Sequence, residues 1–375
     1  MQLVYLSPLP WNSFVQRPHK FVEWFHHKYG GNVLWVDPYP TRLPKWTDLR
    51  RIKTTRIFAN PQTVKAEIPN WLTVIRPHLL PIEPLPGASF ISRWLLWRDI
   101  LRIIDQFMQH GGTLLGIGKP SELALQVLAQ YPAISSFYDA MDDFPAFYQG
   151  LSRAAMARRE QRIADSVSRI SVSSTTLAER FSAYHSKLTV VHNACTVETL
   201  PPIDAIKKQS EDMVIGYLGT IGHWFDWPFV LALAQANSSL NIHLIGPVYT
   251  SVPEPLPCNI RLFPACDHVT AIGLMQAFSV GLIPFKCSDL TASIDPIKYY
   301  EYRALGLPIL STYFGEMARR QGQAGIFIVD ANSDLTYQVN AAMVYKYRRN
   351  EIQIFRKNNS WEARFNASDF LPCSD

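Results

Sequence analysis

The chain has 375 residues, of which 47% are hydrophobic and 18% are charged, and its formal net charge is +5. This composition supplies enough apolar surface for packed cores and excludes an intrinsically disordered chain. The length predicts two domains, because a domain averages roughly 150 residues. Five cysteines are scattered without a C-x-x-C pair, which is typical of reduced thiols. Without a run of about 18 apolar residues or an export signal, we expect a cytoplasmic protein that does not cross a membrane.

In the first half of the chain, short apolar segments alternate with amphipathic ones. We expect strands at 3–6, 32–36, 113–117, 169–174 and 188–191. We expect helices at 16–28, 121–130, 153–165 and 175–184. Such alternation predicts a parallel sheet that is covered by helices on both faces.

The second half repeats this pattern. We expect strands at 213–219, 241–246, 280–285, 308–312 and 325–330. We expect helices at 226–236, 269–278, 297–305 and 333–346. The polar, proline-bearing segment 197–212 separates the two series and is the expected linker. The predicted fold is therefore α/β, with two doubly wound Rossmann-like domains, 1–200 and 201–350, and a ligand crevice between them.

Basic residues gather at 41–56 and 152–162. Such clusters belong either to solvated loops and helices or to a surface that contacts anionic lipid or a sugar phosphate. No DNA-recognition or RNA-recognition motif accompanies them, so nucleic acid is not an expected partner.

A polar cluster between two apolar segments stands at 294–310, with the sequence IDPIKYYEYRALGLPIL. We expect Asp295 to cap a helix whose first residue is Pro296. Lys298 and Glu301 then share one face of that helix. The helix N-terminus and Lys298 suit a phosphate, and Glu301 suits the two hydroxyls of a ribose. The alternative is an exposed Lys–Glu pair worth about 0.3–0.5 kcal/mol.

A second segment, IGYLGTIGHWFDW (215–227), predicts a strand followed by a turn with Gly219 and Gly222 and a helix that begins near Asp226. Glycines after a strand allow the backbone to approach a diphosphate closely. The spacing is not G-x-G-x-x-G, so this is not the dinucleotide fingerprint. GIGKP (116–120) also lacks the third glycine and the P-loop spacing.

Four segments together resemble the GT-B glycosyltransferases, in particular bacterial enzymes of exopolysaccharide, capsule or teichuronic-type glycan synthesis. They are QRPHKFVEWF (16–25), YDAMDDF (138–144), IGYLGTIGHWFDW (215–227) and PIKYYEYRALGLPIL (296–310). The resemblance implies two Rossmann-like domains that face each other across a cleft. We also expect residues 351–375 to form a tail that packs back on the first domain.

The resemblance implies that the second domain binds a nucleotide-sugar, with UDP as the expected nucleotide. The expected donor-binding residues are Gly219, Gly222, His223, Ile297, Lys298, Tyr299 and Glu301. Many retaining members have a glutamate eight positions before the one that matches Glu301, where this chain has Ser293. This difference favours an inverting mechanism. The resemblance also implies that no metal and no other cofactor is needed.

Inversion requires a carboxylate that takes the proton of the acceptor hydroxyl. Asp139, Asp142 and Asp143 follow the strand AISSFY and are the candidate bases, because neighbouring carboxylates raise one another's pKa. Helix capping and solvation are the alternative roles. Arg17 and His19 begin a helix after the first strand, so Arg17 is a candidate contact for the acceptor or the diphosphate and His19 is a further candidate base. A structural role is equally open for both.

The segment 89–107 places Trp94, Trp97, Leu101 and Ile104 at helical spacing, with Arg93, Arg98 and Arg102 between them. Core packing is the usual role of such a stripe, and contact with an anionic membrane is the alternative. The expected function is transfer of a sugar from a nucleotide diphosphate to a glycan acceptor that is itself lipid-linked. A nucleotide-sugar epimerase and a catalytically silent sugar-binding scaffold remain alternatives.

Overall fold

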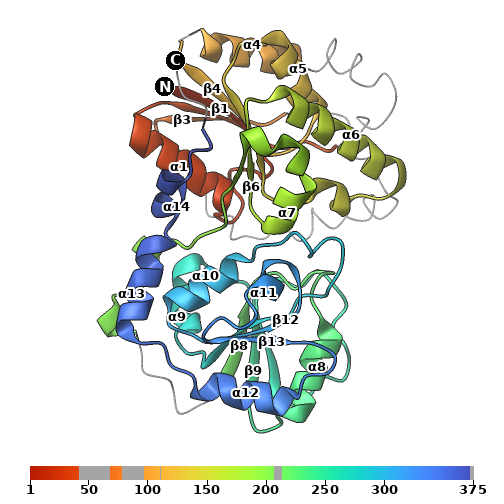
Figure 1. Cartoon of the computed structure of the whole chain (residues 1–375), viewed down its shortest axis with the longest axis vertical. Helices are drawn as coiled ribbons and strands as arrows, with labels where there is room; N and C mark the ends of the chain where they lie inside the picture. Colours follow the sequence, from red (N-terminus) through yellow and green to blue (C-terminus); the bar gives the residue numbers. More distant parts are fainter. Residues whose placement is uncertain (42–67, 78–96, 110, 207–212, 372–375) are drawn as a thin grey trace. The chain divides into compact units, whose positions relative to one another are not determined.

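The computed structural model describes residues 1–41, 68–77, 97–109, 111–206 and 213–371 (Figure 1). These residues form two compact units. The first comprises Met1–Ser173, Leu177–Val191 and Ser368–Asp375, and the second comprises Ser174–Thr176 and His192–Ala367. The chain therefore passes between the units at 191–192 and again at 367–368, and residues 174–176 form a short excursion from the first unit into the second. The cleft expected between the two domains depends on their relative placement and stays a prediction.

The first unit is built on a seven-stranded sheet in the order β3-β2-β1-β4-β5-β6-β7, in which every paired strand is parallel. Its strands are β1 (Gln2–Leu6), β2 (Val33–Val36), β3 (Leu72–Ile75), β4 (Thr113–Ile117), β5 (Ser136–Ala140), β6 (Arg169–Val172) and β7 (Leu188–Val190). Its helices are α1 (Arg17–Tyr29), α4 (Arg98–Met108), α5 (Glu122–Gln130), η1 (Phe144–Phe147), α6 (Gly150–Ser166), α7 (Thr175–Arg180) and η2 (Ser182–Lys187). The strand order reverses between β1 and β4, where such sheets bind their ligands.

The second unit has a six-stranded parallel sheet in the order β10-β9-β8-β11-β12-β13. Its strands are β8 (Val214–Leu218), β9 (Asn241–Ile245), β10 (Ile260–Phe263), β11 (Val280–Ile283), β12 (Ile309–Thr312) and β13 (Ile326–Val329). Its helices are η3 (Val197–Thr199), η4 (Ile203–Ala205), α8 (Trp227–Ala236), α9 (His268–Met275), α10 (Ile297–Ala304), α11 (Gly315–Arg319), α12 (Leu335–Val344), α13 (Arg349–Asn358) and α14 (Trp361–Ala367). Its order reverses between β8 and β11.

The central strands of both sheets are buried on two faces, which explains why they are mainly apolar. In the second unit, α8 and α12 cover one face, and α9 and α10 cover the other. In the first unit, α4, α5 and α6 pack on one face. On the other face, Phe21 of α1 packs against Tyr5 and Phe137, with ring centroids 5.7 and 5.2 Å apart. The predicted class, two doubly wound α/β domains, is confirmed.

The start of α10 differs from the prediction. The helix begins at Ile297 with Pro296 at the N-cap, and Asp295 does not cap it. The Asp295 carboxylate instead accepts hydrogen bonds from the Asn193 N–H (2.7 Å), the Tyr300 hydroxyl (2.8 Å) and the Arg320 guanidinium (2.6 Å). Partners that are distant in the sequence hold this carboxylate, so it is not available to the helix end.

The described part of the expected linker, 197–206, belongs to the second unit, where Arg356 Nη1 donates to the carbonyl oxygen of Pro201 (2.7 Å). The expected C-terminal tail divides. Residues up to Ala367, including α13, belong to the second unit. Beyond them, Phe370 packs against Phe21 and Phe137 of the first unit, at 5.7 and 5.6 Å between ring centroids.

The described part of the segment 89–107 forms most of α4 and contributes to the core. Trp97, Ile100 and Ile104 are buried in the cluster that covers the first sheet, and Leu101 packs against it. Trp94 and Arg93 lie outside the described residues. Arg98 and Arg102 are exposed on the opposite face of the helix.

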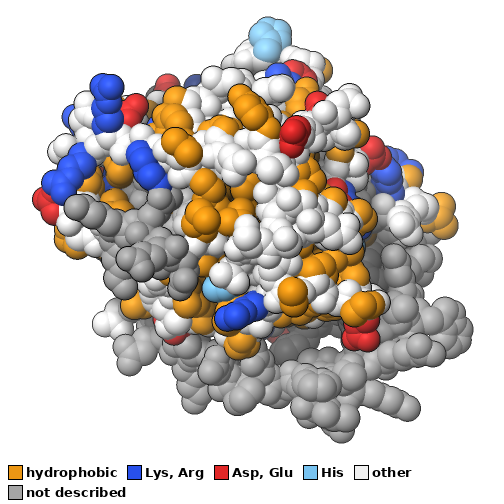
Figure 2. All heavy atoms as spheres, turned by 90° about the horizontal axis from the view of Figure 1, so that it is seen from below, with side chains coloured by type: hydrophobic (Ala, Val, Ile, Leu, Met, Phe, Trp, Pro, Cys, Tyr) orange, Lys and Arg blue, Asp and Glu red, His pale blue; other side chains and the backbone are white. Residues whose placement is uncertain are grey.

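The surface carries apolar side chains at separate points. On the face in Figure 2 they are spread among polar ones, and charged side chains lie mainly toward the margins. The most exposed large apolar residues are Leu151, Val269 and Val344, at 76%, 76% and 80% exposure, on α6, α9 and α12. Single exposed apolar residues are ordinary on folded proteins.

Candidate functional site

In the second unit, the two segments expected to bind the donor meet at the point where the strand order reverses. The glycine turn follows β8, and the loop after the neighbouring strand β11 leads into α10. The backbone N–H of Leu218, at the end of β8, donates to the Tyr302 hydroxyl of α10 (3.1 Å). Gly281 of β11 makes room for the Tyr302 ring, since a Cβ at this position would lie 2.3 Å from it. The fold therefore brings the turn and α10 to the same edge of the sheet.

Packing alone requires glycine in this turn. Gly219 has φ +157°, and a Cβ there would lie 2.8 Å from the Tyr217 hydroxyl. A Cβ on Gly246, in the next loop, would lie 2.1 Å from the carbonyl oxygen of Gly219. A Cβ on Gly222 would meet the Trp224 ring at 2.7 Å. Asp226 caps α8 by accepting from the Phe229 N–H (3.1 Å), as its position in the sequence predicts.

Lys298 and Glu301 form an ion pair on α10, with 2.5 Å between Nζ and Oε2. Their side chains are 23% and 11% exposed, so the pair lies close to the surface without being fully solvated. Both groups face the same side of the helix one turn apart, as the sequence predicts. In the unliganded chain, the ammonium and the carboxylate neutralise each other.

The other expected donor residues differ in accessibility. The Tyr299 ring is buried, with the Arg320 guanidinium 3.7 Å from its centroid, and its hydroxyl donates to Gln323 Oε1 (3.3 Å). Burial raises the pKa of Tyr299. Ile297 is partly exposed at the first position of α10, and His223 is exposed in the glycine turn. These contacts favour a packing role for Tyr299 and leave the other two side chains accessible.

Ser293 is 2% exposed, and its hydroxyl has no hydrogen-bond partner within the described part of the chain. It lies two residues before Asp295, whose carboxylate Arg320 and Tyr300 hold. Position 293 therefore carries no charged group. The Asp295 carboxylate does not replace one, because Arg320 and Tyr300 bind it.

In the first unit, Arg17 and Asp139 form a buried ion pair. Arg17 Nη2 lies 2.8 Å from Asp139 Oδ1, and Nε lies 3.1 Å from both carboxylate oxygens. The guanidinium also donates to Ser171 Oγ (3.0 Å) and to the carbonyl oxygen of Val191 (2.5 Å). The side chains of the pair are 1% and 4% exposed. This arrangement favours a structural role for both residues over the expected ligand and catalytic roles.

His19 is 2% exposed and contacts two indole rings, with ring centroids 5.1 Å from Trp11 and 5.0 Å from Trp35. Its Nδ1 accepts from the Gln16 N–H (3.3 Å), so its Nε2 donates to the carbonyl oxygen of Trp11 (3.1 Å). Burial lowers the pKa of His19, which keeps the ring neutral. With both nitrogens engaged, His19 is better suited to packing than to proton transfer.

The two remaining aspartates differ in their partners. Asp143 Oδ1 accepts from Arg180 Nη1 (2.6 Å), and the same guanidinium also pairs with Glu160. The partly exposed Asp142 carboxylate has no hydrogen-bond or ion-pair partner within the described part of the chain. Burial raises the pKa of Asp142 to about 7; Arg17 opposes this shift, and Asp139 and Asp143 add to it. Of the four candidate bases, Asp142 is the one whose pKa suits proton abstraction near neutral pH.

Comparison with solved structures identifies the fold. The match to sucrose-phosphate synthase from Thermosynechococcus elongatus covers 98% of this chain and 100% of that protein's chain, with a TM-score of 0.66 and 12% sequence identity. HepE of Anabaena in complex with UDP-glucose matches 98% of both chains, with a TM-score of 0.64 and 11% identity. An α,α-trehalose-phosphate synthase from Burkholderia vietnamiensis matches 98% of this chain and 96% of its own, with a TM-score of 0.62 and 10% identity.

The chain has the GT-B fold. In sequence, it is 24% identical over 220 residues to TuaH of Bacillus subtilis (strain 168), a glycosyltransferase assigned to teichuronic acid biosynthesis. The match covers 51% of this chain and 55% of TuaH, so the chain spans about half the length of this curated relative. No family model matches the chain. The solved structures thus support the resemblance to the GT-B fold, and the sequence match to TuaH supports the resemblance to glycosyltransferases of surface-glycan synthesis.

This GT-B chain has no group of three or more His, Cys, Asp or Glu side chains arranged to hold a metal ion within its described residues. No helix among those residues is long and apolar enough to span a bilayer. Arg320 and Arg180, which hold Asp295 and Asp143, were not among the expected site residues. Neither arginine lies in a recognisable motif, so only the fold reveals these contacts.

Proposed function

We propose that this GT-B chain is a glycosyltransferase that moves a sugar from a nucleotide-diphosphate sugar to a glycan acceptor. The observation that carries the proposal is the pair Lys298 and Glu301 at the start of α10, beside the glycine turn at the reversal point of the second sheet. The HepE complex supports a UDP-sugar such as UDP-glucose as the donor. The similarity to TuaH supports a role in bacterial surface polysaccharide synthesis.

In the proposed donor complex, Glu301 accepts hydrogen bonds from the ribose hydroxyls and Lys298 turns toward the diphosphate. The ion pair between them opens as the nucleotide binds. The dipole at the N-terminus of α10 adds to the positive potential around the phosphates. This charge stabilises the nucleoside diphosphate as it leaves with the electron pair of the broken C–O bond. No metal ion is needed for that step.

Asp142 is the proposed general base. Its carboxylate takes the proton of the acceptor hydroxyl while that oxygen forms a bond to the anomeric carbon on the face opposite the diphosphate. A single displacement of this kind inverts the anomeric configuration. The neutral, buried Ser293 supports this mechanism, because it cannot supply a second carboxylate on the donor side.

We further propose that the acceptor is lipid-linked and that the enzyme works in the cytoplasm, on the inner face of the membrane. Arg98 and Arg102, exposed on α4, would meet anionic headgroups. The apolar face of this helix packs into the core, so any such contact is electrostatic and sensitive to salt.

A donor panel tests the proposal. The purified chain is incubated with UDP-, GDP- and dTDP-sugars, with and without a glycan extract as acceptor, and nucleotide release is measured. Release that depends on the acceptor supports transfer. Interconversion of donor sugars without an acceptor would indicate an epimerase, and binding without turnover would indicate a scaffold. Proton NMR of the product then reports its anomeric configuration, and retention would reject the base mechanism of Asp142.

A further inference from the structure

A lysine outside the set of expected donor residues lies at the reversal point of the second sheet. Lys286 stands just beyond the end of β11, and its side chain is exposed. Its ammonium group donates one hydrogen bond, to the carbonyl oxygen of His223 in the glycine turn (3.1 Å). Within the described residues it forms no ion pair. An ammonium has three hydrogens to donate, so most of its capacity is available to a ligand.

The backbone around Lys286 is fixed against the glycine turn. The Lys286 N–H donates to the carbonyl oxygen of Trp224 (2.8 Å), and the Asp226 N–H donates to that of Pro284 (2.8 Å). The Lys286 carbonyl oxygen accepts from the hydroxyl of Thr291, which is fully buried. The ammonium can therefore reach a ligand by rotations of the side chain alone, while the backbone stays in place.

The two ends of the glycine turn lie beside different lysines. At its start, the Leu218 N–H donates to the Tyr302 hydroxyl of α10 (3.1 Å), and Lys298 precedes Tyr302 by one helical turn on the same face. At its other end, Lys286 contacts the backbone of His223. A ligand that lies along the turn therefore extends from one lysine toward the other.

The negative charge of the expected ligand exceeds what the ion pair on α10 neutralises. Lys298 is paired with Glu301, so the pair has no net charge. A diphosphate is a multiply charged anion, and the nucleoside diphosphate gains further negative charge as it leaves the sugar. A cation that is already in place stabilises such developing charge. Lys286 is positioned to supply this cation at the far end of the turn.

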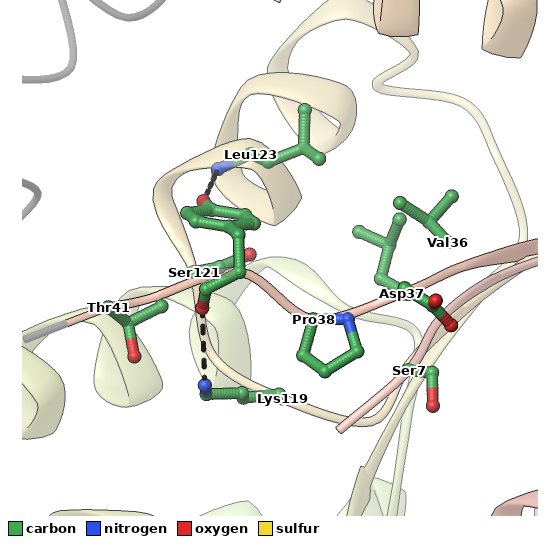
Figure 3. Close-up of a pocket in the computed structure, with 10 residues that line it drawn as sticks. Ser7, Val36, Asp37, Pro38, Thr41, Lys119, Ser121 and Leu123 are labelled. Carbon is green, nitrogen blue, oxygen red and sulfur yellow. Dashed lines mark hydrogen bonds between the residues drawn. The ribbon is translucent and has the colours of Figure 1, made fainter. Parts of the chain in front are cut away.

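The first sheet has a lysine at the corresponding position, but its surroundings are closed. Lys119 follows β4 beside the reversal point, and its ammonium donates to the carbonyl oxygen of Tyr39 (3.5 Å), the contact that Figure 3 marks with a dashed line. The hollow next to it has room for about one water molecule. Its apolar lining, Leu6, Val36 and Leu123, is buried in the core. A diphosphate does not fit there, so Lys119 is a matched control for Lys286.

We propose that Lys286 binds the second phosphate of the donor, the one that bears the sugar, and stabilises it as it leaves. The inference rests on the proposed function, because it assigns a further residue of the donor site. With Glu301 at the ribose, the phosphate farther from the ribose lies nearer to Lys286. Lys298 and Lys286 therefore contact different parts of the donor.

In this arrangement, the ammonium of Lys286 turns from the His223 carbonyl to the phosphate oxygens when the donor binds. The C–O bond to the sugar then breaks, and its electron pair stays on the phosphate oxygen beside Lys286. The acceptor oxygen forms the new bond to the sugar, and its proton goes to Asp142. Lys286 keeps its own protons throughout and acts only by its charge and its hydrogen bonds.

Calorimetric titrations with UDP, UMP and uridine test this assignment without any need for turnover. We expect Lys286→Gln to weaken UDP binding by about tenfold, the usual size of a charge-assisted contact, and to leave UMP and uridine binding nearly unchanged. Lys286→Arg, which keeps the charge, should retain most of the UDP affinity. Lys119→Gln and Lys357→Gln, the latter at an exposed lysine on α13, are controls that should bind UDP as the intact chain does.

Steady-state rates provide a second readout. Because negative charge develops on the leaving phosphate during transfer, we expect Lys286→Gln to lower kcat by about 10²-fold, more than it weakens UDP binding. Unchanged UDP affinity, or equal losses of UDP and UMP affinity, would overturn the inference. Weakened UDP binding with an unchanged kcat would reject the stabilisation of the leaving phosphate. Urea denaturation verifies that each variant is folded, and Lys286→Met gives the same test should Lys286→Gln lose stability.

Failure of the proposed function gives a different result. An intact chain that binds none of UDP, GDP and dTDP is rejected as the transferase, and the inference is rejected with it. An intact chain that binds UDP, and binds it equally well after Lys286→Gln, keeps the proposed function and loses only the inference. If GDP or dTDP binds in place of UDP, its own monophosphate and nucleoside replace UMP and uridine in the titrations.

Discussion

Arg17 and Asp139 lie 122 residues apart in the sequence and form a buried two-oxygen ion pair, in which Arg17 also binds the carbonyl oxygen of Val191. Val191 ends the segment Leu177–Val191 of the first unit, and the long segment His192–Ala367 of the second unit follows it. The pair therefore joins α1, β5 and the end of this segment. Catalytic groups are expected at the carboxyl end of a strand. The position of the ion pair explains why Asp139, which lies there, has a structural role instead.

Removing one partner of this pair should destabilise the fold. We expect Asp139→Ala to lower the free energy of unfolding by about 3–5 kcal/mol, because it leaves the Arg17 guanidinium buried without a counter-charge. Urea denaturation followed by tryptophan fluorescence measures this. The double variant Arg17→Met with Asp139→Leu should lose less stability, because it leaves no unpaired charge in the core. An Asp139→Ala variant with normal stability and no turnover would instead restore the catalytic assignment.

Substitutions of Asp142 and Asp143, the two aspartates after β5, should have different effects on the rate of transfer. We expect Asp142→Asn to lower kcat by about 10²–10⁴-fold with unchanged UDP affinity, because the proton acceptor is lost and the donor site is not. Asp143→Asn is the matched control, and it should keep most of its activity, since its carboxylate is paired with Arg180. Steady-state rates and calorimetry with UDP check both. Comparable rate losses in the two variants would contradict the assignment of the base to Asp142 alone.

The raised pKa of Asp142 also predicts a pH-dependent stability. Its pKa is about 7 in the folded chain against an ordinary value of 3.8, so between these values the folded state binds more protons than the unfolded state. The contribution of this group to stability is therefore complete below about pH 4 and is lost as the pH rises to about 7. We expect Asp142→Asn to be more stable than the parent chain at pH 8, with a difference that shrinks toward pH 4. Urea midpoints across this range measure it, and a variant less stable at pH 8 would refute the pKa argument.

On the donor side, Glu301→Ala should weaken UDP binding by about 1.5–3 kcal/mol, the range for hydrogen bonds to a charged group. Lys298→Ala should reduce the affinity for UDP far more than that for uridine, because its charge acts on the phosphates. Isothermal calorimetry with both ligands measures this difference. Unchanged UDP affinity in folded Glu301→Ala, or equal losses of UDP and uridine in Lys298→Ala, would show that the ion pair serves only to stabilise α10.

Much of the fold follows from the local sequence pattern. Alternating apolar segments and helical periodicity place most strands and helices within a few residues of where they form, since hydrophobic spacing is a short-range property of the chain. Strands β3 and β10 and helices α11, α13 and α14 are not anticipated. Helix α13 carries mostly polar and charged residues and buries only Ile352 and Arg356, so its apolar stripe is too narrow to predict.

Local sequence patterns were sufficient to predict the two α/β domains, the glycine turn, a helix with Lys298 and Glu301, and an aspartate cluster at the end of a strand. Which of the three aspartates lacks a partner depends on contacts between distant segments. Arg17 and Arg180 reach Asp139 and Asp143 from 122 and 37 residues away, and among the described residues Asp142 has no such partner. Spacing along the chain gives the face on which a side chain lies, but its pKa and its availability depend on charges and burial that distant segments supply.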